Sequence, residues 1–295
     1  MGPKKAPGLD GFTAEILKRA LLSIRNYLLR LYNGMLSSGR FPTGWKEAQV
    51  VLIPKKNASN DEFKSIRPIS LISVIAKLGE KLINRRLQWF FLETEFLSNA
   101  QYGFVRGRGT ADLLLQISAD VRNSDDKYVI GILLDISSVF DNAWWLLILD
   151  SLRRRECPRN IHAVLCDYLK DRKVSLVYRG LQVSKSLSRG CPQGSVLGPH
   201  LWNVVMDSLL RLDLGENVKV YAYADDLTVL LGGNSRSAVE NRANEAMARV
   251  LEWGGNSKIT YPGPWSRHLK KKYPAMLEIQ TIYRRHSSGH FWSLR

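Results

Sequence analysis

The sequence predicts a mixed fold of the α+β class, and three features of its patterning support that prediction. Long segments with apolar residues at helical spacing are interspersed with short apolar runs of strand length. Two pairs of these runs are joined by short turns, as in β-hairpins, so we expect antiparallel strands. With 295 residues, 45% of them hydrophobic, the chain can form one large domain or two small ones.

Seven segments have the patterning of α-helices. They are 13–36, 71–91, 111–121, two segments on either side of Pro158, one starting near Gly198, and 235–253. In the last of these the apolar residues step by four and three positions, and Ser235 is placed to cap the helix at its N-terminus.

Six short runs have the β-branched and apolar content of strands. They are "AQVVLIPKK", "YVIGILLDI", "KVSLVY", "QVSKSLS", "VKVYAY" and "LTVLL". The third and fourth flank "RGL" and predict a hairpin, and the last two are joined through Ala224, Asp225 and Asp226.

The charge balance indicates a polyanionic partner. Lys and Arg number 43 against 27 Asp and Glu, which gives a formal net charge of +16. No segment is a basic amphipathic membrane helix or an uninterrupted apolar span, so we expect nucleic acid and no membrane. The three cysteines have no CxxC spacing, which indicates neither a zinc site nor a disulfide framework and favours a reducing intracellular compartment.

Three acidic residues carry the strongest chemical signal. Asp135 lies near the end of one apolar strand, and Asp225 and Asp226 lie between two others. Read alone, the adjacent pair fits a solvated hairpin turn. If the strands are neighbours in one sheet, however, three carboxylates converge and need a positive partner. Mg²⁺ prefers such oxygen ligands, and a pair of ions can promote phosphoryl displacement, so the pattern predicts a nucleotidyl-transfer site.

The residues around these acids resemble the conserved motifs of reverse transcriptases. The A, B and C motifs of that family resemble "LLDISSVFDNAWW", "GCPQGSVLGPHLWNVVMDSLL" and "YADDLTVLL". The upstream motifs of the non-LTR retrotransposon branch are similar to "APGLDGFTAEILK", "IRPISLISVIAKLGEKLINRRL" and "QYGFVRGRGT". The residues of these motifs are most similar to those of the arthropod R1 type, and the resemblance extends from about Pro3 to Lys258.

This resemblance implies the fingers and palm of a right-hand polymerase, with an antiparallel palm sheet packed on helices. The implied fingers span 1–128, with 156–190 returning to them, and the palm spans 129–260. The remaining segment, 261–295, is a basic tail of net charge 7 − 1 = +6, which we expect to be divergent or frameshifted. The thumb is accordingly expected to be missing or incomplete.

The resemblance also implies an activity and its partners. The activity would be RNA-directed DNA polymerisation, which uses an RNA template, a DNA primer, dNTPs and two Mg²⁺ ions, with Mn²⁺ as an alternative. The parent polyprotein would also carry an endonuclease and a Cys/His region, and it would act in the nucleus.

The resemblance assigns a role to each matching residue. Asp135, Asp225 and Asp226 would hold the metal ions, and Phe140 would lie beneath the sugar and exclude ribonucleotides. Gln193 and Gly194 would contact the incoming nucleotide, and Arg67 and Lys64 would contact its triphosphate. The template would be contacted by four arginines: Arg85, Arg86, Arg106 and Arg108.

Other interpretations of these residues remain open. Phe140 fits ordinary core packing, and the basic side chains fit a solvated surface. Asp141 fits a helix cap, and Asp10 fits a turn better than a metal ligand. For the whole chain the alternatives are a group II intron or retron-type reverse transcriptase and a non-catalytic, polymerase-like RNA-binding remnant. A viral RNA-dependent RNA polymerase is disfavoured by "YADD" and Phe140.

Overall fold

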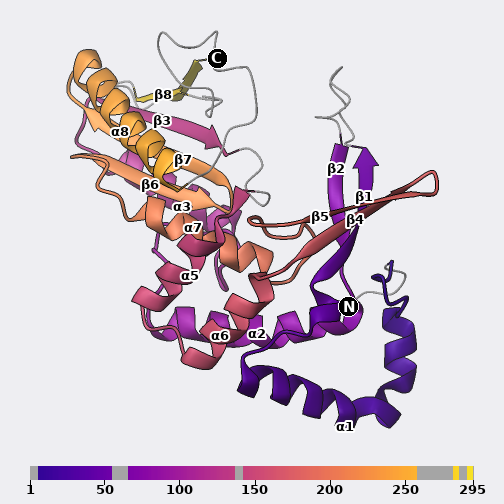
Figure 1. Cartoon of the computed structure of the whole chain (residues 1–295). Helices are drawn as coiled ribbons and strands as arrows, with labels where there is room; N and C mark the ends of the chain where they lie inside the picture. The colour runs from indigo at the N-terminus through magenta and orange to yellow at the C-terminus, as the bar shows by residue number, and fades with distance from the viewer. Residues whose placement is uncertain (1–5, 55–65, 137–141, 258–281, 286–290, 295) are drawn as a thin grey trace. The chain divides into compact units, whose positions relative to one another are not determined.

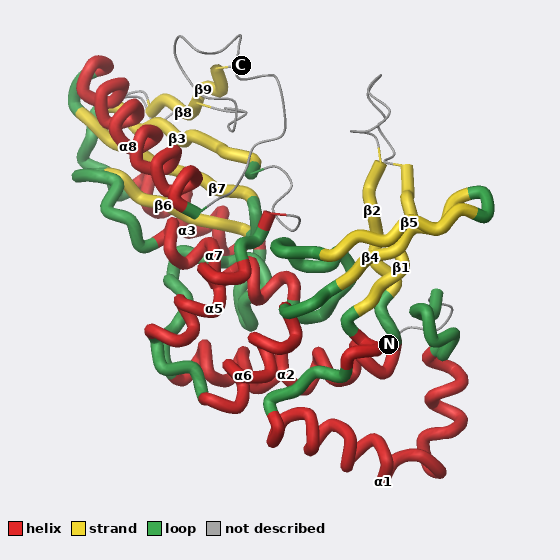
Figure 2. Tube along the Cα trace, in the orientation of Figure 1, coloured by secondary structure: helices red, strands yellow, loops and turns green. Residues whose placement is uncertain are grey.

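The computed structural model describes residues 6–54, 66–136, 142–257, 282–285 and 291–294 (Figures 1 and 2). These residues fall into two compact units. The first unit comprises Met1–Phe96 and Trp145–Leu201, and the second comprises Leu97–Trp144 and Trp202–Arg295. These limits differ from the boundaries predicted at 128, 156 and 190, and the assignment of fingers and palm stays a prediction. Lys64, Phe140 and Asp141 lie outside the described residues.

The helices of the first unit follow the predicted periodicity. They are α1 (Ala14–Ser38), α2 (Val74–Glu93), α5 (Trp145–Arg154) and α6 (Arg159–Leu169), with a short 3₁₀ helix, η1, at Thr43–Trp45. Thr13 caps α1 by accepting a hydrogen bond from Ile16 N at 3.3 Å. Ser73 caps α2 in the same way, so this helix begins three residues after the predicted Leu71.

A mixed sheet with the order β2-β1-β4-β5 completes the first unit. Its strands are β1 (Glu47–Pro54), β2 (Ile66–Leu71), β4 (Lys173–Tyr178) and β5 (Leu181–Ser186). The β4–β5 hairpin is confirmed. Strand β2 was not predicted, because Pro68 within it argues against a strand in sequence; it lies at the edge of the sheet, where proline is tolerated.

The second unit is built around an antiparallel sheet with the order β3-β7-β6. Its strands are β3 (Tyr128–Asp135), β6 (Val218–Tyr223) and β7 (Asp226–Gly233), and its helices are α3 (Thr110–Arg122), most of α7 (Gly198–Leu210) and α8 (Arg236–Asn256). Helix α8 runs across one face of this sheet (Figure 1). The acidic site was predicted on the condition that the strands next to the three acids are neighbours in one sheet. The pairing of β3 and β6 with β7 confirms that condition.

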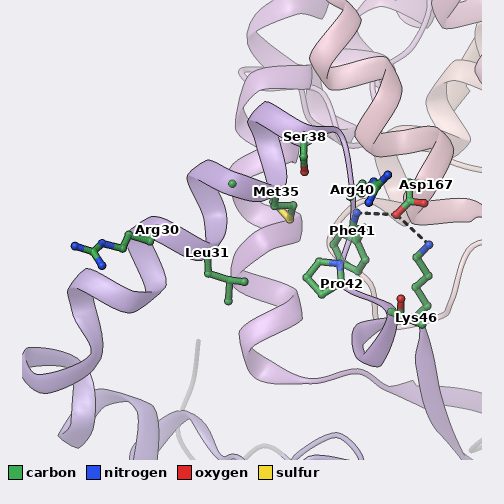
Figure 3. A pocket seen from close by; sticks show the side chains of 11 residues that line it. Arg30, Leu31, Met35, Ser38, Arg40, Phe41, Pro42, Lys46 and Asp167 are labelled. Atoms are coloured by element: carbon green, nitrogen blue, oxygen red, sulfur yellow. Dashed lines mark hydrogen bonds and ion pairs between the residues drawn. The ribbon is translucent and has the colours of Figure 1, made fainter.

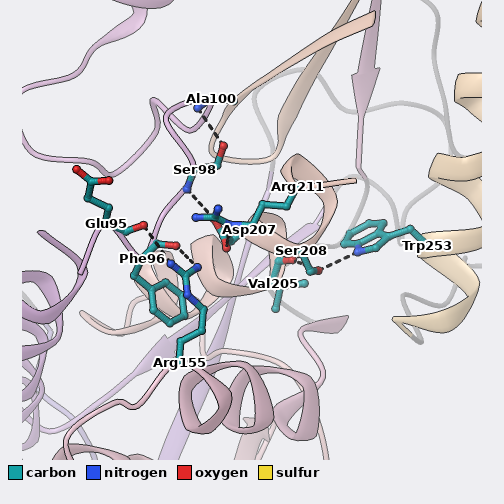
Figure 4. Close-up of polar contacts among 10 residues, drawn as sticks. All are labelled: Glu95, Phe96, Ser98, Ala100, Arg155, Val205, Asp207, Ser208, Arg211 and Trp253. Carbon is teal, nitrogen blue, oxygen red and sulfur yellow. Dashed lines mark hydrogen bonds and ion pairs between the residues drawn. The ribbon is translucent and has the colours of Figure 1, made fainter. Parts of the chain in front are cut away.

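Polar contacts fix the helices of the second unit to its loops (Figure 4). Asp207 of α7 accepts a hydrogen bond from Ser98 N at 2.6 Å and pairs with Arg211 at 2.7 Å. Trp253 of α8 donates to Ser208 Oγ at 2.9 Å. Helices α7 and α8 are thus joined beside the sheet.

The basic tail contributes two short strands to the described chain. They are β8 (Ile282–Arg285) and β9 (Phe291–Leu294), and they pair antiparallel with each other. These strands were not among the predicted ones, because the apolar periodicity of this segment is poor. None of the helices in the described part of the chain is both long and apolar enough to cross a membrane.

Candidate functional site

The three predicted acids come together at one end of the β3-β7-β6 sheet. In the antiparallel register, Asp135 lies directly opposite Asp226. Directly opposed residues in such a pair have Cα atoms about 4.5–5.5 Å apart. Asp225 occupies the turn that precedes Asp226; its side chain is half-buried, whereas that of Asp226 is exposed. Strand pairing thus brings Asp135 and Asp226 together, although they are 91 positions apart in the chain.

The turn between β6 and β7 has only two residues in its loop. Tyr223 pairs with Asp226, so Ala224 and Asp225 form the loop. Ala224 has a φ of +62°, in the left-handed region that residues other than glycine occupy at a cost of about 1–2 kcal/mol. Such strain persists only where neighbouring groups hold the backbone in place.

The segment 100–103 holds the strained turn from one side. Gln101 is almost fully buried, and its Oε1 accepts hydrogen bonds from Ala224 N at 3.3 Å and from Gly103 N at 2.9 Å. Tyr102 N donates to Ala222 O at 2.8 Å, and Ala222 N donates to Ala100 O at 2.9 Å. The first residues of the "QYGFVRGRGT" motif therefore hold the hairpin in place, through the Gln101 side chain and through backbone hydrogen bonds.

Helix α7 holds the same turn through two fully buried side chains. Trp202 Nε1 donates to Ala224 O at 3.2 Å, and Asn203 Nδ2 donates to Gly103 O at 2.9 Å. Both polar groups of Ala224 thus have partners, one in Gln101 and one in Trp202. Gln101, Gly103 and Trp202 were not predicted to be functional residues, although each lies within one of the motifs "QYGFVRGRGT" and "GCPQGSVLGPHLWNVVMDSLL".

Strand β6 is fixed to α3 through one carboxylate. Asp120 of α3 pairs with Lys219 at 2.5 Å and accepts a hydrogen bond from Tyr221 Oη. Burial by itself would raise the pKa of Asp120, but the hydrogen bonds from Lys219, Tyr221 and Gln116 lower it below its usual value. Burial is the largest cause that raises the pKa of the Tyr221 hydroxyl, and its hydrogen bond to Asp120 raises that pKa further. Tyr221 therefore stays neutral, and its hydrogen bond holds β6 in place.

The predicted nucleotide contacts Gln193 and Gly194 lie in a loop of the first unit. Ser70 N of β2 donates to Gln193 O at 2.8 Å, so this loop is docked against the edge of β2. Gly194 has a φ of +109°, and a side chain on it would approach Ser70 O to 2.9 Å. Only glycine fits this position without displacing backbone. Arg67, which lies three residues before Ser70, is exposed on β2.

The predicted template-binding arginines differ in their surroundings. Arg85 and Arg86 are exposed on α2, and Arg106 is exposed in the loop before α3. Arg108 is half-buried instead; its Nη1 donates to Asn99 O at 2.8 Å and to Gln101 O at 3.0 Å, and its guanidinium lies over the Tyr102 ring. Arg108 therefore stabilises the loop that supports the acidic turn, and its contact with a template stays a prediction.

Asp10 belongs to a turn, which agrees with the interpretation made from the sequence. It accepts a hydrogen bond from Phe12 N at 3.3 Å and another from Ser73 Oγ. The first contact stabilises the turn before α1, and the second joins that turn to the start of α2.

The donor chemistry of the acidic cluster fits hard divalent cations. The backbone register places three acidic residues on two adjacent strands and the turn between β6 and β7. Carboxylate oxygens are the ligand type that Mg²⁺ and Mn²⁺ prefer. The part of the chain with described side chains contains no group of three or more His, Cys, Asp or Glu residues that could hold a metal ion, and the Asp135 side chain is not in that part.

A pocket of about 630 Å³ lies in the first unit beside α1 (Figure 3). Its lining includes Met35, Arg40, Phe41, Lys46 and Asp167. The Asp167 carboxylate is bonded to neighbouring groups of the same unit: it pairs with Lys46 at 3.0 Å and accepts a hydrogen bond from Phe41 N at 2.7 Å. The pocket contains none of the residues predicted to be functional.

Comparison with known families identifies the class of protein. The model of the reverse transcriptase (RNA-dependent DNA polymerase) family matches residues 53–262, which include all three acids and the Gln193–Gly194 loop. The chain belongs to this family.

Its similar proteins include polyproteins of mobile elements. It is 34% identical over 252 residues to the retrovirus-related Pol polyprotein from type-1 retrotransposable element R1 of Bradysia coprophila, covering 85% of this chain and 25% of that protein. It is 31% identical over 268 residues to the RNA-directed DNA polymerase from mobile element jockey of Drosophila melanogaster, covering 87% of this chain and 29% of that one. The chain thus spans about a quarter of the length of these relatives.

A solved structure supports the fold. The chain resembles apo telomerase from Candida tropicalis, truncated from its C-terminal domain, with a TM-score of 0.50 and 13% identity over 79% of this chain and 53% of that one. The predicted α+β polymerase fold is confirmed.

Proposed function

We propose that this chain is the RNA-directed DNA polymerase part of a longer non-LTR retrotransposon polyprotein. The observation that carries the proposal is the register that sets Asp135 opposite Asp226, with Asp225 in the supported turn between β6 and β7. Family membership and the similarity to the R1 polyprotein support it. The net charge of +16 favours a nucleic-acid partner.

In the proposed reaction, the 3′-hydroxyl of a DNA primer attacks the α-phosphate of a dNTP and pyrophosphate leaves. Asp135, Asp225 and Asp226 would hold two Mg²⁺ ions, or Mn²⁺. When bound, such ions stabilise the charge that develops on the attacking and leaving oxygens. The supports around Ala224 would keep the acidic turn in one geometry, which is the protein's main contribution to a reaction that depends on positioning.

The proposed nucleotide and template contacts follow the resemblance. Gln193 and Gly194 would contact the incoming nucleotide, and Arg67 and Lys64 its triphosphate. Phe140 would exclude the 2′-hydroxyl of ribonucleotides. The proposed template contacts are Arg85, Arg86, Arg106 and Arg108. The rest of the polyprotein would supply an endonuclease and a Cys/His region, and it would act in the nucleus.

Primer extension tests the proposed function directly. The purified chain is incubated with poly(rA)/oligo(dT), dTTP and Mg²⁺, beside a sample with excess chelator. We expect extension that the chelator abolishes. A folded chain that binds the duplex in a salt-sensitive manner but extends no primer would contradict the proposal and indicate an RNA-binding remnant.

The hydrogen bond from Trp202 to Ala224 can be tested with a matched pair of variants. Trp202→Phe removes the Nε1–H donor below the acidic turn, and Trp253→Phe removes a similar donor to Ser208 Oγ away from that turn. Both variants should lose about 1–3 kcal/mol of unfolding free energy, because each buried side chain loses a hydrogen bond and part of its ring. Only Trp202→Phe should also slow extension, by about tenfold, because only it frees Ala224 O. Equal extension rates in the two variants would show that the bond does not position the turn.

A further inference from the structure

A fully buried carboxylate of the first unit contacts the loop that carries Gln193 and Gly194. Glu80 of α2 is 0% exposed. Its Oε2 accepts a hydrogen bond from Val196 N at 2.6 Å, and its Oε1 accepts one from Tyr168 Oη at 2.9 Å. Val196 lies two residues after Gly194, so the buried Glu80 anchors the loop just after the predicted nucleotide contacts.

The charge of Glu80 has a buried counterpart. The guanidinium of Arg172, 1% exposed, lies over the Tyr168 ring at 4.5 Å and donates to Tyr168 O at 3.1 Å. Burial raises the pKa of Glu80, while the bond from Val196 and the charge of Arg172 act in the opposite direction. Both charged groups also contact Tyr168, whose hydroxyl donates to Glu80 and whose ring lies under the Arg172 guanidinium.

Glu80 belongs to a polar stripe along one face of α2. Glu80, Asn84 and Gln88 follow each other at four-residue spacing, so they lie on one face of the helix. Gln88 Nε2 contacts His200 Nε2 in the first turn of α7. Both ends of the segment 196–200 are therefore bonded to the same helix.

The loop itself is tightly constrained on either side of the two predicted nucleotide contacts. Before them, Trp145 Nε1 donates to Gly190 O at 2.8 Å. At Gln193, the backbone oxygen accepts a hydrogen bond from Ser70 N of β2. After Gly194, Val196 N donates to the Glu80 carboxylate. Gly190 and Gly194 have φ values of +89° and +109°, so the loop has a specific backbone path. Loss of the Glu80 bond would release the side of the loop that follows Gly194.

We infer that Glu80 is a positioning residue for nucleotide binding: its carboxylate holds Val196 N and thereby sets where Gln193 and Gly194 meet the incoming dNTP. This inference rests on the proposed polymerase function. The short bond from Val196 N to the Glu80 carboxyl oxygen, at 2.6 Å, fixes the backbone two residues after Gly194, which suits such a role.

The test compares Glu80→Ala with Glu80→Gln and two controls. Glutamine keeps an oxygen to accept from Val196 N and an amide group to donate to Tyr168 Oη, whereas alanine keeps neither. Lys81→Gln changes an exposed neighbour on the same helix, and Ile148→Ala creates a cavity in the buried part of α5. The measurements are hydrogen exchange of the 190–198 peptide, steady-state incorporation of dTTP and binding of the primer–template duplex.

For Glu80→Ala we expect faster exchange of the 190–198 peptide and a KM for dTTP raised about tenfold or more, with kcat within about threefold of the parent chain and unchanged duplex binding. Glu80→Gln and Lys81→Gln should remain within about threefold of the parent KM, and Ile148→Ala should lower stability without changing KM. Unchanged exchange in Glu80→Ala, or the same kinetic pattern in Ile148→Ala, would overturn the inference. A parent chain that extends no primer would contradict the proposed function instead, and the exchange measurement would still decide whether Glu80 anchors the loop.

Discussion

Replacing Asp225 with alanine is expected to lower the rate of primer extension by about a thousandfold or more. The turn places this carboxylate beside Asp226, which lies opposite Asp135. Removing one of three carboxylates at a proposed two-metal site should remove several kcal/mol of transition-state stabilisation, and about 4 kcal/mol corresponds to about a thousandfold. The measurement is single-nucleotide incorporation of dTTP on poly(rA)/oligo(dT) at saturating Mg²⁺.

Folding should not account for this loss. Adjacent carboxylates repel each other, so alanine at position 225 should leave the thermal midpoint within a few degrees of that of the parent chain. Asp213→Asn is the matched control, because Asp213 is an exposed acid of the same unit that pairs with Arg249 at 3.6 Å, and asparagine can still accept the bond from Gly215 N. Asp225→Ala retaining more than a tenth of the parent rate would contradict the assignment of Asp225 to the metal site.

Replacing Gly103 with alanine is expected to have the largest effect on the geometry of the acidic turn. A Cβ atom on Gly103 would lie 2.1 Å from Ala224 N and 2.7 Å from Ala224 Cα. Both are backbone atoms, so the strained turn or the 100–103 segment must move. We expect a loss of about 3 kcal/mol in unfolding free energy, at the upper end of the usual cost of overpacking, together with at least about hundredfold slower extension.

The control for Gly103→Ala is another glycine of the same unit. Gly255 lies in the last turn of α8, and a Cβ there meets nothing within 4 Å. Because alanine has the higher helix propensity, Gly255→Ala should be neutral or stabilising by up to about 1 kcal/mol. Urea denaturation measures both variants. Equal midpoints for Gly103→Ala and the parent chain would show that the close packing of the 100–103 segment on the turn is unimportant.

Local patterning predicted most of the helices and strands because the signals lie within single segments. Helix α8 illustrates this: its apolar spacing predicted the helix, and Ser235 indeed accepts a hydrogen bond from Ala238 N at 3.2 Å. Strand β2 illustrates the limit. Its six residues include Pro68 and run directly into a helical pattern, so only its pairing with β1 identifies it as a strand.

The supports of the site could not be predicted from the sequence, because they depend on contacts between distant segments. Gln101 and Ala224 are 123 residues apart, and Glu80 and Val196 are 116 residues apart. A buried glutamine or glutamate has no local signature that names its partner. The parallel pairing of β1 with β4 is equally remote in sequence.

The sequence by itself predicted which residues carry the chemistry: two adjacent acids between two apolar strands, a third at the end of another apolar strand, and a strongly basic chain around them. Those properties follow from residue types and short-range periodicity. Only the tertiary structure decided that β3 pairs with β7 so that Asp135 meets Asp226, that Gln101 and Trp202 bond to the two polar groups of Ala224, and that Glu80 holds the Gln193–Gly194 loop. These contacts join segments about 20 to 120 residues apart, and they form because packing the two cores buries polar groups that must then find partners.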